Sequence, residues 1–305
     1  MASIDRVLLP DTAEIDGDGV LSIGGCNLVE LASEYGTPLF VYDESHLRAR
    51  CQEAVAGFAD GVAYAAKAFL CTAMARLAHE EGMRIDVATG GEMHVALAAG
   101  VPAARLVVHG NNKSDAELEA SLAVGVGRLI IDSFDEMDRL ERLADKATAP
   151  LRVLIRVNPG VAAHTHEYLM TGALDSKFGF GLASGDAHAA VERASDSDAM
   201  DLVGIHAHIG SQVFDTAFFD RAIGTLAPFV TSVGLSEFSV GGGLGVAYVA
   251  GEGTPSITEW ADVVHKAVRT SGIDARIMAE PGRAIVASAA VTLYSVGTIK
   301  EIEGV

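Results

Sequence analysis

Cysteine and basic residues are scarce in this sequence of 305 residues. It has 3 cysteines, Cys26, Cys51 and Cys71, with no CxxC pair, so neither a disulfide framework nor a cysteine-rich zinc site is supported. Lys and Arg number 22 against 41 Asp and Glu, which gives a formal net charge of −19. This acidic balance argues against non-specific binding to nucleic acid or to an anionic membrane.

Long apolar runs and an export signal are also missing. The longest uncharged stretch, residues 284–299, contains polar residues and is shorter than the roughly 20 apolar residues that span a bilayer. Residues 1–10 mix Asp5 and Arg6 into their only apolar stretch, so they lack the apolar core of a signal peptide. We therefore expect a cytoplasmic protein.

What the sequence does have is a regular alternation of short β-rich runs and longer amphipathic stretches. Hydrophobic residues make up 50% of the chain, enough for a sizeable core. At about 150 residues per domain, the length predicts two domains or one large α/β barrel with additions. Eight strands are predicted at residues 62–65, 84–88, 106–109, 129–132, 152–157, 203–208, 238–240 and 276–279. Helical spacing of apolar residues predicts helices at residues 73–81, 92–99, 115–124, 135–144 and 258–270.

Eight such units favour an α/β fold of the (β/α)8 TIM-barrel type over an open, doubly wound sheet. An open sheet would favour a G-x-G-x-x-G turn after its first strand, and here the sequence Lys67-Ala-Phe follows instead. Residues 1–40 and 285–305 carry short β-like segments that do not fit the barrel. We predict a barrel at residues 45–284, with residues 1–44 and 285–305 as parts of a second, β-rich domain whose C-terminal portion is cut short.

In a βα barrel the active site lies at the C-terminal ends of the strands, so residues at those positions are candidates. Lys67 follows the first strand, where desolvation would lower the pKa of its amine and make it a nucleophile. Taken alone, Lys67 is better explained as a surface lysine that starts the next helix. Asp86 ends the second strand, before a Gly90-Gly91-Glu92 segment that also fits an ordinary helix start.

Four of the 10 histidines form two pairs that are candidates for the site. His206 and His208 face the same side of the sixth strand, the lumen, because strand side chains alternate with period 2. His208 either stacks on a flat ring or is a hydrogen-bonded core histidine. His164 and His166 follow the fifth strand, but no third ligand is spaced nearby, so we predict no metal site.

The last two barrel loops indicate phosphate binding. A run of glycines, 241–243, follows the seventh strand, and Glu280-Pro-Gly-Arg283 follows the eighth. Barrels often bind phosphate between these two loops, since glycine leaves backbone N–H groups accessible and arginine donates two parallel hydrogen bonds. An amine, a phosphate cradle, a ring-stacking histidine and a carboxylate together suit pyridoxal 5'-phosphate. Lys67 would form the Schiff base, and Glu280 would keep the pyridine nitrogen protonated.

Ten short motifs, in order along nearly the whole chain, resemble the fold-type III, alanine-racemase-like family of pyridoxal phosphate enzymes and, within it, the diaminopimelate decarboxylases. The motifs are Phe40-Val-Tyr-Asp43, Tyr64-Ala-Ala-Lys67-Ala, Asp86-Val-Ala-Thr-Gly-Gly-Glu92, His109-Gly-Asn-Asn-Lys113, Arg156-Val-Asn-Pro-Gly160, His164-Thr-His-Glu-Tyr168, Asp175-Ser-Lys-Phe-Gly-Phe180, His206-Ala-His-Ile-Gly-Ser-Gln212, Gly241-Gly-Gly243 and Glu280-Pro-Gly-Arg283. Ornithine- and arginine-type relatives share the lysine, histidine and Glu-Pro-Gly-Arg elements.

The resemblance implies decarboxylation of meso-2,6-diaminopimelate to L-lysine by a homodimer. Lys67, His208 and Glu280 would be catalytic, and Arg283 would also contact the substrate. The cofactor would be bound by Lys67, Asp86, His208, Ser211, Gly241, Gly242, Gly243, Glu280, Pro281, Gly282 and Arg283.

Besides a related pyridoxal phosphate-dependent decarboxylase of another basic amino acid, two alternatives remain at this stage. A racemase of the same fold tends to place an arginine opposite the pyridine nitrogen, so Glu280 argues against it. The family's C-terminal domain brings a Cys-Glu-Ser-type motif that the sequence up to Val305 does not contain. A catalytically silent barrel that binds the cofactor is therefore the second alternative.

Overall fold

The computed structural model describes residues 4–143, 149–160 and 177–302. At its centre lies a barrel of parallel strands, with each strand hydrogen-bonded to the next. This confirms the predicted (β/α)8 architecture and all eight predicted barrel strands. In order around the barrel they are β5 (Ala63–Ala65), β6 (Arg84–Val87), β7 (Leu106–Val108), β8 (Arg128–Ile131), β9 (Leu151–Asn158), β11 (Met200–His206), β12 (Glu237–Ser239) and β13 (Arg276–Met278).

The first and last strands close the barrel. The N–H of Ala63 donates to the carbonyl of Ala279 at 2.9 Å, and the N–H of Ala279 donates to the carbonyl of Gly61 at 3.1 Å. Gly61 permits this approach, because a Cβ there would lie 2.1 Å from the carbonyl oxygen of Ile277. Closure places the loop after β13 directly beside the loop after β5.

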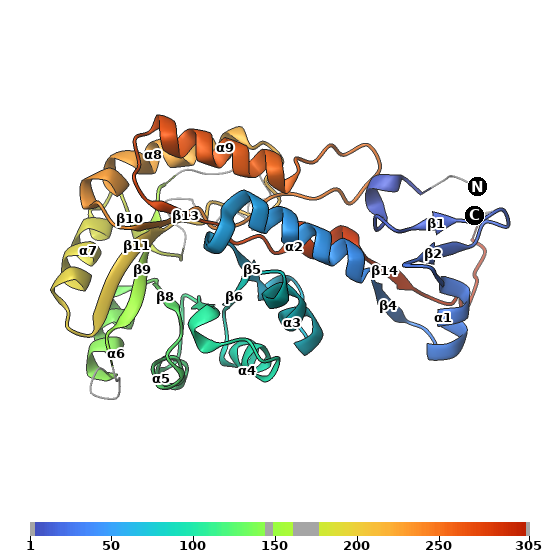
Figure 1. Cartoon of the computed structure of the whole chain (residues 1–305), viewed down its shortest axis with the longest axis horizontal. Helices are drawn as coiled ribbons and strands as arrows, with labels where there is room; N and C mark the ends of the chain where they lie inside the picture. The colour runs from blue at the N-terminus through green and yellow to red at the C-terminus, as the bar shows by residue number, and fades with distance from the viewer. Residues whose placement is uncertain (1–3, 144–148, 161–176, 303–305) are drawn as a thin grey trace.

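Helices surround the strands and bury the outward-facing apolar side chains (Figure 1). Helix α2 (Glu44–Phe58) precedes β5, and its first residue follows an Asp43 N-cap that accepts from the N–H of His46. The remaining helices of this layer are α3 (Thr72–Glu80), α4 (Gly90–Ala98), α5 (Asp115–Val124), α6 (Phe134–Leu143), α7 (Asp186–Asp196), α8 (Ala217–Val233) and α9 (Ile257–Thr270).

The lumen is filled in layers. At the N-terminal ends of the strands it is charged, with Arg84, Arg128 and Glu237 all buried. The layer above is apolar and contains Ala63, Val107, Ile130, Leu154, Val203 and Met278. The C-terminal ends are polar again, so the fold puts a buried polar cluster at the barrel mouth, where active sites of this fold lie.

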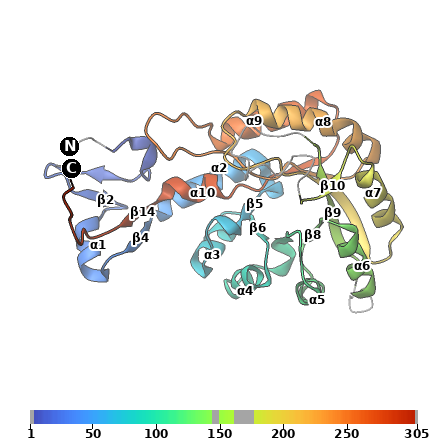
Figure 2. The ribbon, with the colours of Figure 1, turned by 180° about the vertical axis from the view of Figure 1, so that it is seen from behind.

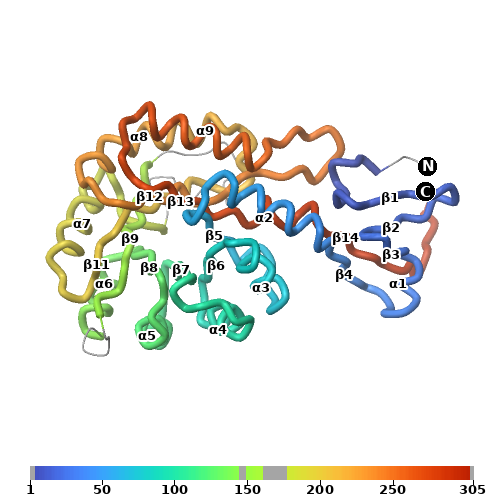
Figure 3. The backbone as a smooth tube through the Cα atoms, in the orientation of Figure 1, coloured from blue at the N-terminus to red at the C-terminus, as the bar shows by residue number. Residues whose placement is uncertain are grey.

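A smaller β-rich part stands at one end of the molecule, beyond α2 (Figures 1 and 2). It contains an antiparallel sheet of β1 (Glu14–Ile15), β2 (Leu21–Ile23) and β3 (Cys26–Asn27), followed by α1 (Leu28–Tyr35). Strands β4 (Leu39–Tyr42) and β14 (Ala290–Leu293) form a second antiparallel sheet, side by side although they come from opposite ends of the chain (Figure 3).

Three details differ from the sequence-based expectation. A short strand, β10 (Phe180–Gly181), pairs with β9 and was not predicted. Strand β14 ends at Leu293, although the alternation of apolar and polar residues over 291–299, in the β-like segment 285–305, predicts strand up to residue 299. The two-stranded sheet offers residues 294–299 no partner in the described part of the chain. Helix α10 (Arg283–Val286) spans the predicted domain boundary at residue 285. The position of this boundary therefore remains a prediction. Among the described residues, no helix has the length and apolarity to cross a membrane.

Candidate active site at the barrel mouth

Strand register decides which polar side chains reach the mouth of the barrel. His206 on β11 is in register with Arg156 on β9 and with Ser239 on β12. Residues in register on parallel strands face the same side of the sheet, so all three point into the lumen. All three are buried, as are Asp86 and Glu280. The predicted inward orientation of His206 agrees with this geometry.

Both carboxylate oxygens of Glu280 accept hydrogen bonds within the cluster. One carboxylate oxygen accepts from Nε2 of His206 at 3.0 Å, and the other accepts from the hydroxyl of Ser239 at 2.9 Å. Burial by itself would raise the pKa of Glu280, but His206 and His109 outweigh burial and hold that pKa well below its usual value. Glu280 is therefore an ionised, immobilised carboxylate in a buried site.

His206, at the end of β11, and His208, just after it, are neutral. Burial lowers the pKa of His206 to about 4, despite the opposing effect of Glu280. Burial, together with the charges of Lys67 and Arg156, also holds the pKa of His208 well below its ordinary value. Nδ1 of His208 accepts a hydrogen bond from the N–H of Gly242 at 3.2 Å, which ties its ring to the glycine loop.

Lys67 lies on the same rim as Glu280. It stands in a single turn, Ala66–Ala68, directly after β5, and its side chain is exposed at the mouth. The N–H of Ala65 donates to the carbonyl of Pro281 at 3.1 Å, so the Lys67 turn adjoins the Glu280 loop. The Lys67 charge also acts on Asp86, His109 and His208. An accessible amine and the ionised carboxylate thus lie on the same rim of the barrel.

The glycine loop after β12 requires its glycines. Gly241 and Gly243 have φ angles of 70° and 107°, which L side chains rarely adopt. A Cβ on Gly242 would lie 2.1 Å from the carbonyl oxygen of Glu280, and one on Gly243 would lie 2.1 Å from that of Gly210. The glycine loop therefore packs closely against the loops after β11 and β13, and its three glycines carry no side chains that would cover the backbone.

The remaining predicted residues border this loop. Ser211 follows His208 in the loop after β11 and is half-buried. Gly282 packs on β5, since a Cβ there would lie 2.9 Å from that of Ala65. Arg283 donates to the hydroxyl of Tyr248, and its guanidinium lies 5.6 Å from the centre of that ring. These residues form one continuous rim with Lys67 and the glycines.

Some members of the cluster were not singled out as site residues from the sequence. Asp132 and Arg156 form a buried ion pair at 3.3 Å, and Ser239 holds Glu280. The sequence could have indicated these three residues, because each is a polar residue that interrupts an apolar strand at a lumen-facing position. Tyr248 had no such signal, since it lies in an irregular loop. His164 and His166 fall outside the described residues.

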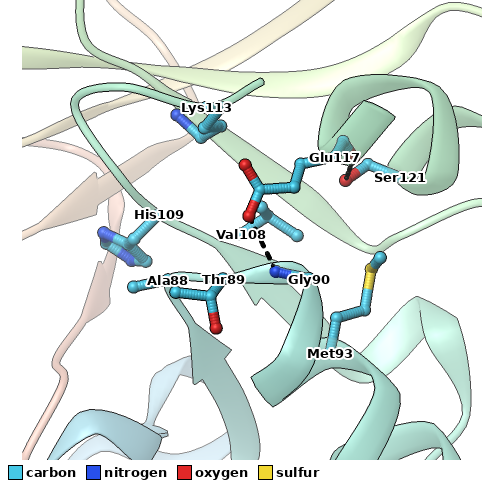
Figure 4. A pocket seen from close by; sticks show the side chains of 9 residues that line it. All are labelled: Ala88, Thr89, Gly90, Met93, Val108, His109, Lys113, Glu117 and Ser121. Carbon is cyan, nitrogen blue, oxygen red and sulfur yellow. Dashed lines mark hydrogen bonds between the residues drawn. The ribbon is translucent and has the colours of Figure 1, made fainter. Parts of the chain in front are cut away.

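Carboxylates from the surrounding helices brace the loops of the mouth (Figure 4). Glu117 on α5 accepts from the N–H of Gly90 at 2.9 Å and thereby joins the loops after β6 and β7. Glu136 on α6 accepts from Nζ of Lys113 at 2.6 Å, which joins the loops after β7 and β8. The polar cluster is thus supported from behind by the half-buried Glu117 carboxylate and by the buried Lys113–Glu136 ion pair.

These residues fit the predicted pyridoxal phosphate. The fit has three elements: an accessible amine, a side-chain-free glycine loop beside an arginine, and a buried ionised carboxylate. In addition, Nδ1 of His206 is buried without a hydrogen-bond partner in the described part of the structure. Such a buried unpaired nitrogen is unusual in a site built only for stability.

Comparison with known proteins gives the same answer. Residues 44–287 match the family described as "Pyridoxal-dependent decarboxylase, pyridoxal binding domain". The diaminopimelate decarboxylase of Mycobacterium tuberculosis is 44% identical over 96% of this chain and 70% of its own length. That of Bacillus subtilis is 41% identical over 98% of this chain and 72% of its own.

Solved structures agree in fold and family. The diaminopimelate decarboxylase of M. jannaschii superposes with a TM-score of 0.89 at 31% identity, covering 96% of this chain and 71% of that one. The same enzyme has been solved in complex with L-lysine. The cofactor and the enzyme class predicted from the motifs are confirmed by these matches. The chain belongs to the diaminopimelate decarboxylase family of pyridoxal phosphate-dependent enzymes.

Proposed function

We propose that this protein decarboxylates meso-2,6-diaminopimelate to L-lysine with pyridoxal phosphate as its cofactor. The observation that carries the proposal is the placement of the Lys67 amine and the ionised Glu280 carboxylate on one rim of the barrel, within a chain whose relatives perform this reaction. The bound cofactor supplies an electron sink for the charge left when the substrate loses carbon dioxide.

The residues of the chain prepare the site for that chemistry. Lys67 would attach the cofactor through its amine. Glu280 would face the pyridine nitrogen and favour its protonated form, because an ionised carboxylate stabilises an adjacent positive charge. His208 would hold one face of the ring, with its orientation fixed by the hydrogen bond from Gly242.

A second set of residues would hold the phosphate and the substrate. Gly241, Gly242, Gly243, Ser211, Pro281, Gly282 and Arg283 line the rim on which the phosphate would lie, and Asp86 supports the cluster from β6. Arg283 would also contact a substrate carboxylate, with Tyr248 limiting its movement. Charged donors of this kind bind phosphate and carboxylate strongly.

We further propose a cytoplasmic homodimer. Large apolar side chains exposed on or beside the β4–β14 sheet support self-association: Phe40, Tyr294, Val296 and Ile299 are 66%, 74%, 83% and 83% exposed. The domain division at residues 1–44, 45–284 and 285–305 is part of the same proposal.

The proposal is tested by incubating the protein with pyridoxal phosphate and meso-2,6-diaminopimelate. We expect release of carbon dioxide and lysine. Lys67→Ala should abolish both the yellow colour that borohydride bleaches and the activity, because no other amine occupies that position. Glu280→Gln should keep the colour but lower kcat by at least ~100-fold, the scale of losing a charge aimed at the reacting system.

Two outcomes would contradict the proposal. Racemised substrate without carbon dioxide would assign the chain to the racemase alternative. A yellow wild-type protein that forms no product from any of diaminopimelate, ornithine, arginine or lysine would instead support the silent barrel that only binds the cofactor.

A further inference from the structure

His109 occupies a position that the proposed reaction does not yet use. It follows β7, and its N–H donates to the carbonyl of Val87 at 2.8 Å, which fixes its backbone beside β6. Its Nε2 lies 3.4 Å from Oε1 of Glu280 and 3.7 Å from Oδ1 of Asp86. The side chain is 11% exposed. One imidazole nitrogen therefore stands between two buried carboxylates.

The charges around His109 favour its protonated form. Asp86 faces it from β6 and Glu280 from the loop after β13, while Lys67 is the nearest opposing positive charge. His206 lies edge-on to His109, with ring centres 5.0 Å apart, and is neutral. The Arg156 guanidinium is paired with Asp132. Burial alone would lower the pKa of His109, but the two carboxylates outweigh burial and raise it.

Two buried like charges cannot both stay ionised without a cation between them. His206 and Ser239 donate hydrogen bonds to Glu280, and His206 and His109 together lower the pKa of its carboxylate. Desolvation and Glu280 already raise the pKa of Asp86, which shows the strain between the two carboxylates. Among the described residues, His109 is the side chain whose nitrogen lies within ion-pair distance of both carboxylates, while the charge of Arg156, which is paired with Asp132, also acts on both.

We propose that His109 is a positioning residue that, as an imidazolium between Asp86 and Glu280, keeps Glu280 ionised and oriented toward the pyridine nitrogen of the cofactor. This inference rests on the proposed function. Without His109 the two carboxylates share a proton, and Glu280 then stabilises the protonated pyridine less well. The residue acts through Glu280 and not on the substrate.

The test compares the affinity of the protein for pyridoxal phosphate with its affinity for the 1-deaza analogue, in which a carbon replaces the ring nitrogen. Only the natural cofactor can use the Glu280 charge. We expect His109→Asn to weaken binding of pyridoxal phosphate by about tenfold, the equivalent of one pKa unit. Binding of the deaza analogue should change much less. Glu280→Gln should likewise weaken the binding of pyridoxal phosphate more than the binding of the deaza analogue. The exposed His94→Asn serves as the matched control.

A second measurement observes the protonation directly. With cofactor labelled by ¹⁵N in the ring, the nitrogen chemical shift of the wild-type protein should report a protonated ring over a wide pH range. In His109→Asn the ring should lose its proton at a pH lower by about one unit. A structural defect would change neither the analogue preference nor this titration.

Several outcomes would overturn the inference. Equal losses for both cofactors would make His109 a structural residue, and an unchanged nitrogen titration would show that it does not act on Glu280. The ligand atoms of His109, His206 and Glu280 also lie within 4.8 Å of one another. A stoichiometric metal ion in the purified wild type, lost in His109→Asn, would show a coordinating imidazole instead of an imidazolium. Wild-type protein that fails to bind pyridoxal phosphate would refute the proposed function itself.

Discussion

At the scale of single residues, hydrogen bonds from neutral donors stabilise the buried carboxylate of Glu280. Nε2 of His206 donates to Glu280, while its Nδ1 has no hydrogen-bond partner in the described part of the chain. Burial outweighs the attraction of Glu280 and lowers the pKa of His206 to about 4. His206 therefore supplies a hydrogen bond at neutral pH without adding a positive charge that would compete with the cofactor nitrogen.

This lowered pKa predicts a pH dependence of stability. A histidine titrates near 6.5 in the unfolded chain and at about 4 here, so between these values the unfolded chain binds more protons. His206 thus contributes stability above pH 6.5 that is lost as the pH falls toward 4. In His206→Gln, which cannot titrate, the fall in unfolding free energy of the cofactor-free protein from pH 7 to pH 5 should be smaller by about 2 kcal/mol.

Urea unfolding at several pH values measures this difference. The exposed His94→Gln on α4 should behave like the wild type. An identical pH dependence in wild type and His206→Gln would show that the pKa of His206 is the same in the folded and unfolded chain.

At the scale of secondary-structure elements, charged side chains at the N-terminal ends of the strands form a buried cluster at the end of the barrel opposite the active site. Nε and Nη2 of Arg128, at the start of β8, each donate to Glu237, at the start of β12, at 2.5 Å. Arg276, which begins β13, donates to the same carboxylate. The side chains of Arg128 and Glu237 are 3% and 2% exposed. Three strands are thus joined by one buried carboxylate.

Breaking this junction should cost stability but not catalysis. Arg128→Met removes one partner of a buried pair and should lower the unfolding free energy by about 3 kcal/mol, the lower end of the usual range because Arg276 still pairs with Glu237. The double variant Arg128→Met/Glu237→Leu should recover part of the loss, since no buried charge is then left unpaired. Urea unfolding and kcat at saturating substrate measure the two effects. A large fall in kcat with unchanged stability would contradict this separation of barrel floor and barrel mouth.

At the scale of the whole molecule, the β4–β14 sheet is small and carries exposed apolar side chains on or beside it. It has two strands, so each presents an unpaired edge. Exposed apolar side chains follow β14, and Phe40 projects from β4. Unpaired edges with apolar side chains promote association between chains.

We therefore expect the purified chain to self-associate. Size-exclusion chromatography with light scattering should give a dimer or larger species, and Val296→Lys/Ile299→Lys should shift the population toward monomer by removing apolar surface and adding charge. His94→Lys places a charge on the barrel instead and should leave the distribution unchanged. A monodisperse wild-type monomer at micromolar concentration would refute the expectation.

The sequence alone determined the barrel, the cofactor and the family. Strand positions follow from local hydrophobic patterns and motifs such as Tyr64-Ala-Ala-Lys67-Ala from residue order, and neither needs knowledge of distant contacts. The barrel strands were accordingly predicted to within a few residues. Strand β10, with only 2 residues, carries too little pattern to be recognised.

Only the tertiary structure decided how the site works. Glu280 receives its hydrogen bonds from His206 and Ser239, which are 74 and 41 residues away in the chain. Arg128 and Glu237 are 109 residues apart. No local pattern encodes these pairs, because they exist only once the barrel has closed and brought different strands to the same layer. The protonation states of Glu280, His206 and His109 depend on that burial and on those neighbours, and so they follow from the closed barrel and not from the order of the residues.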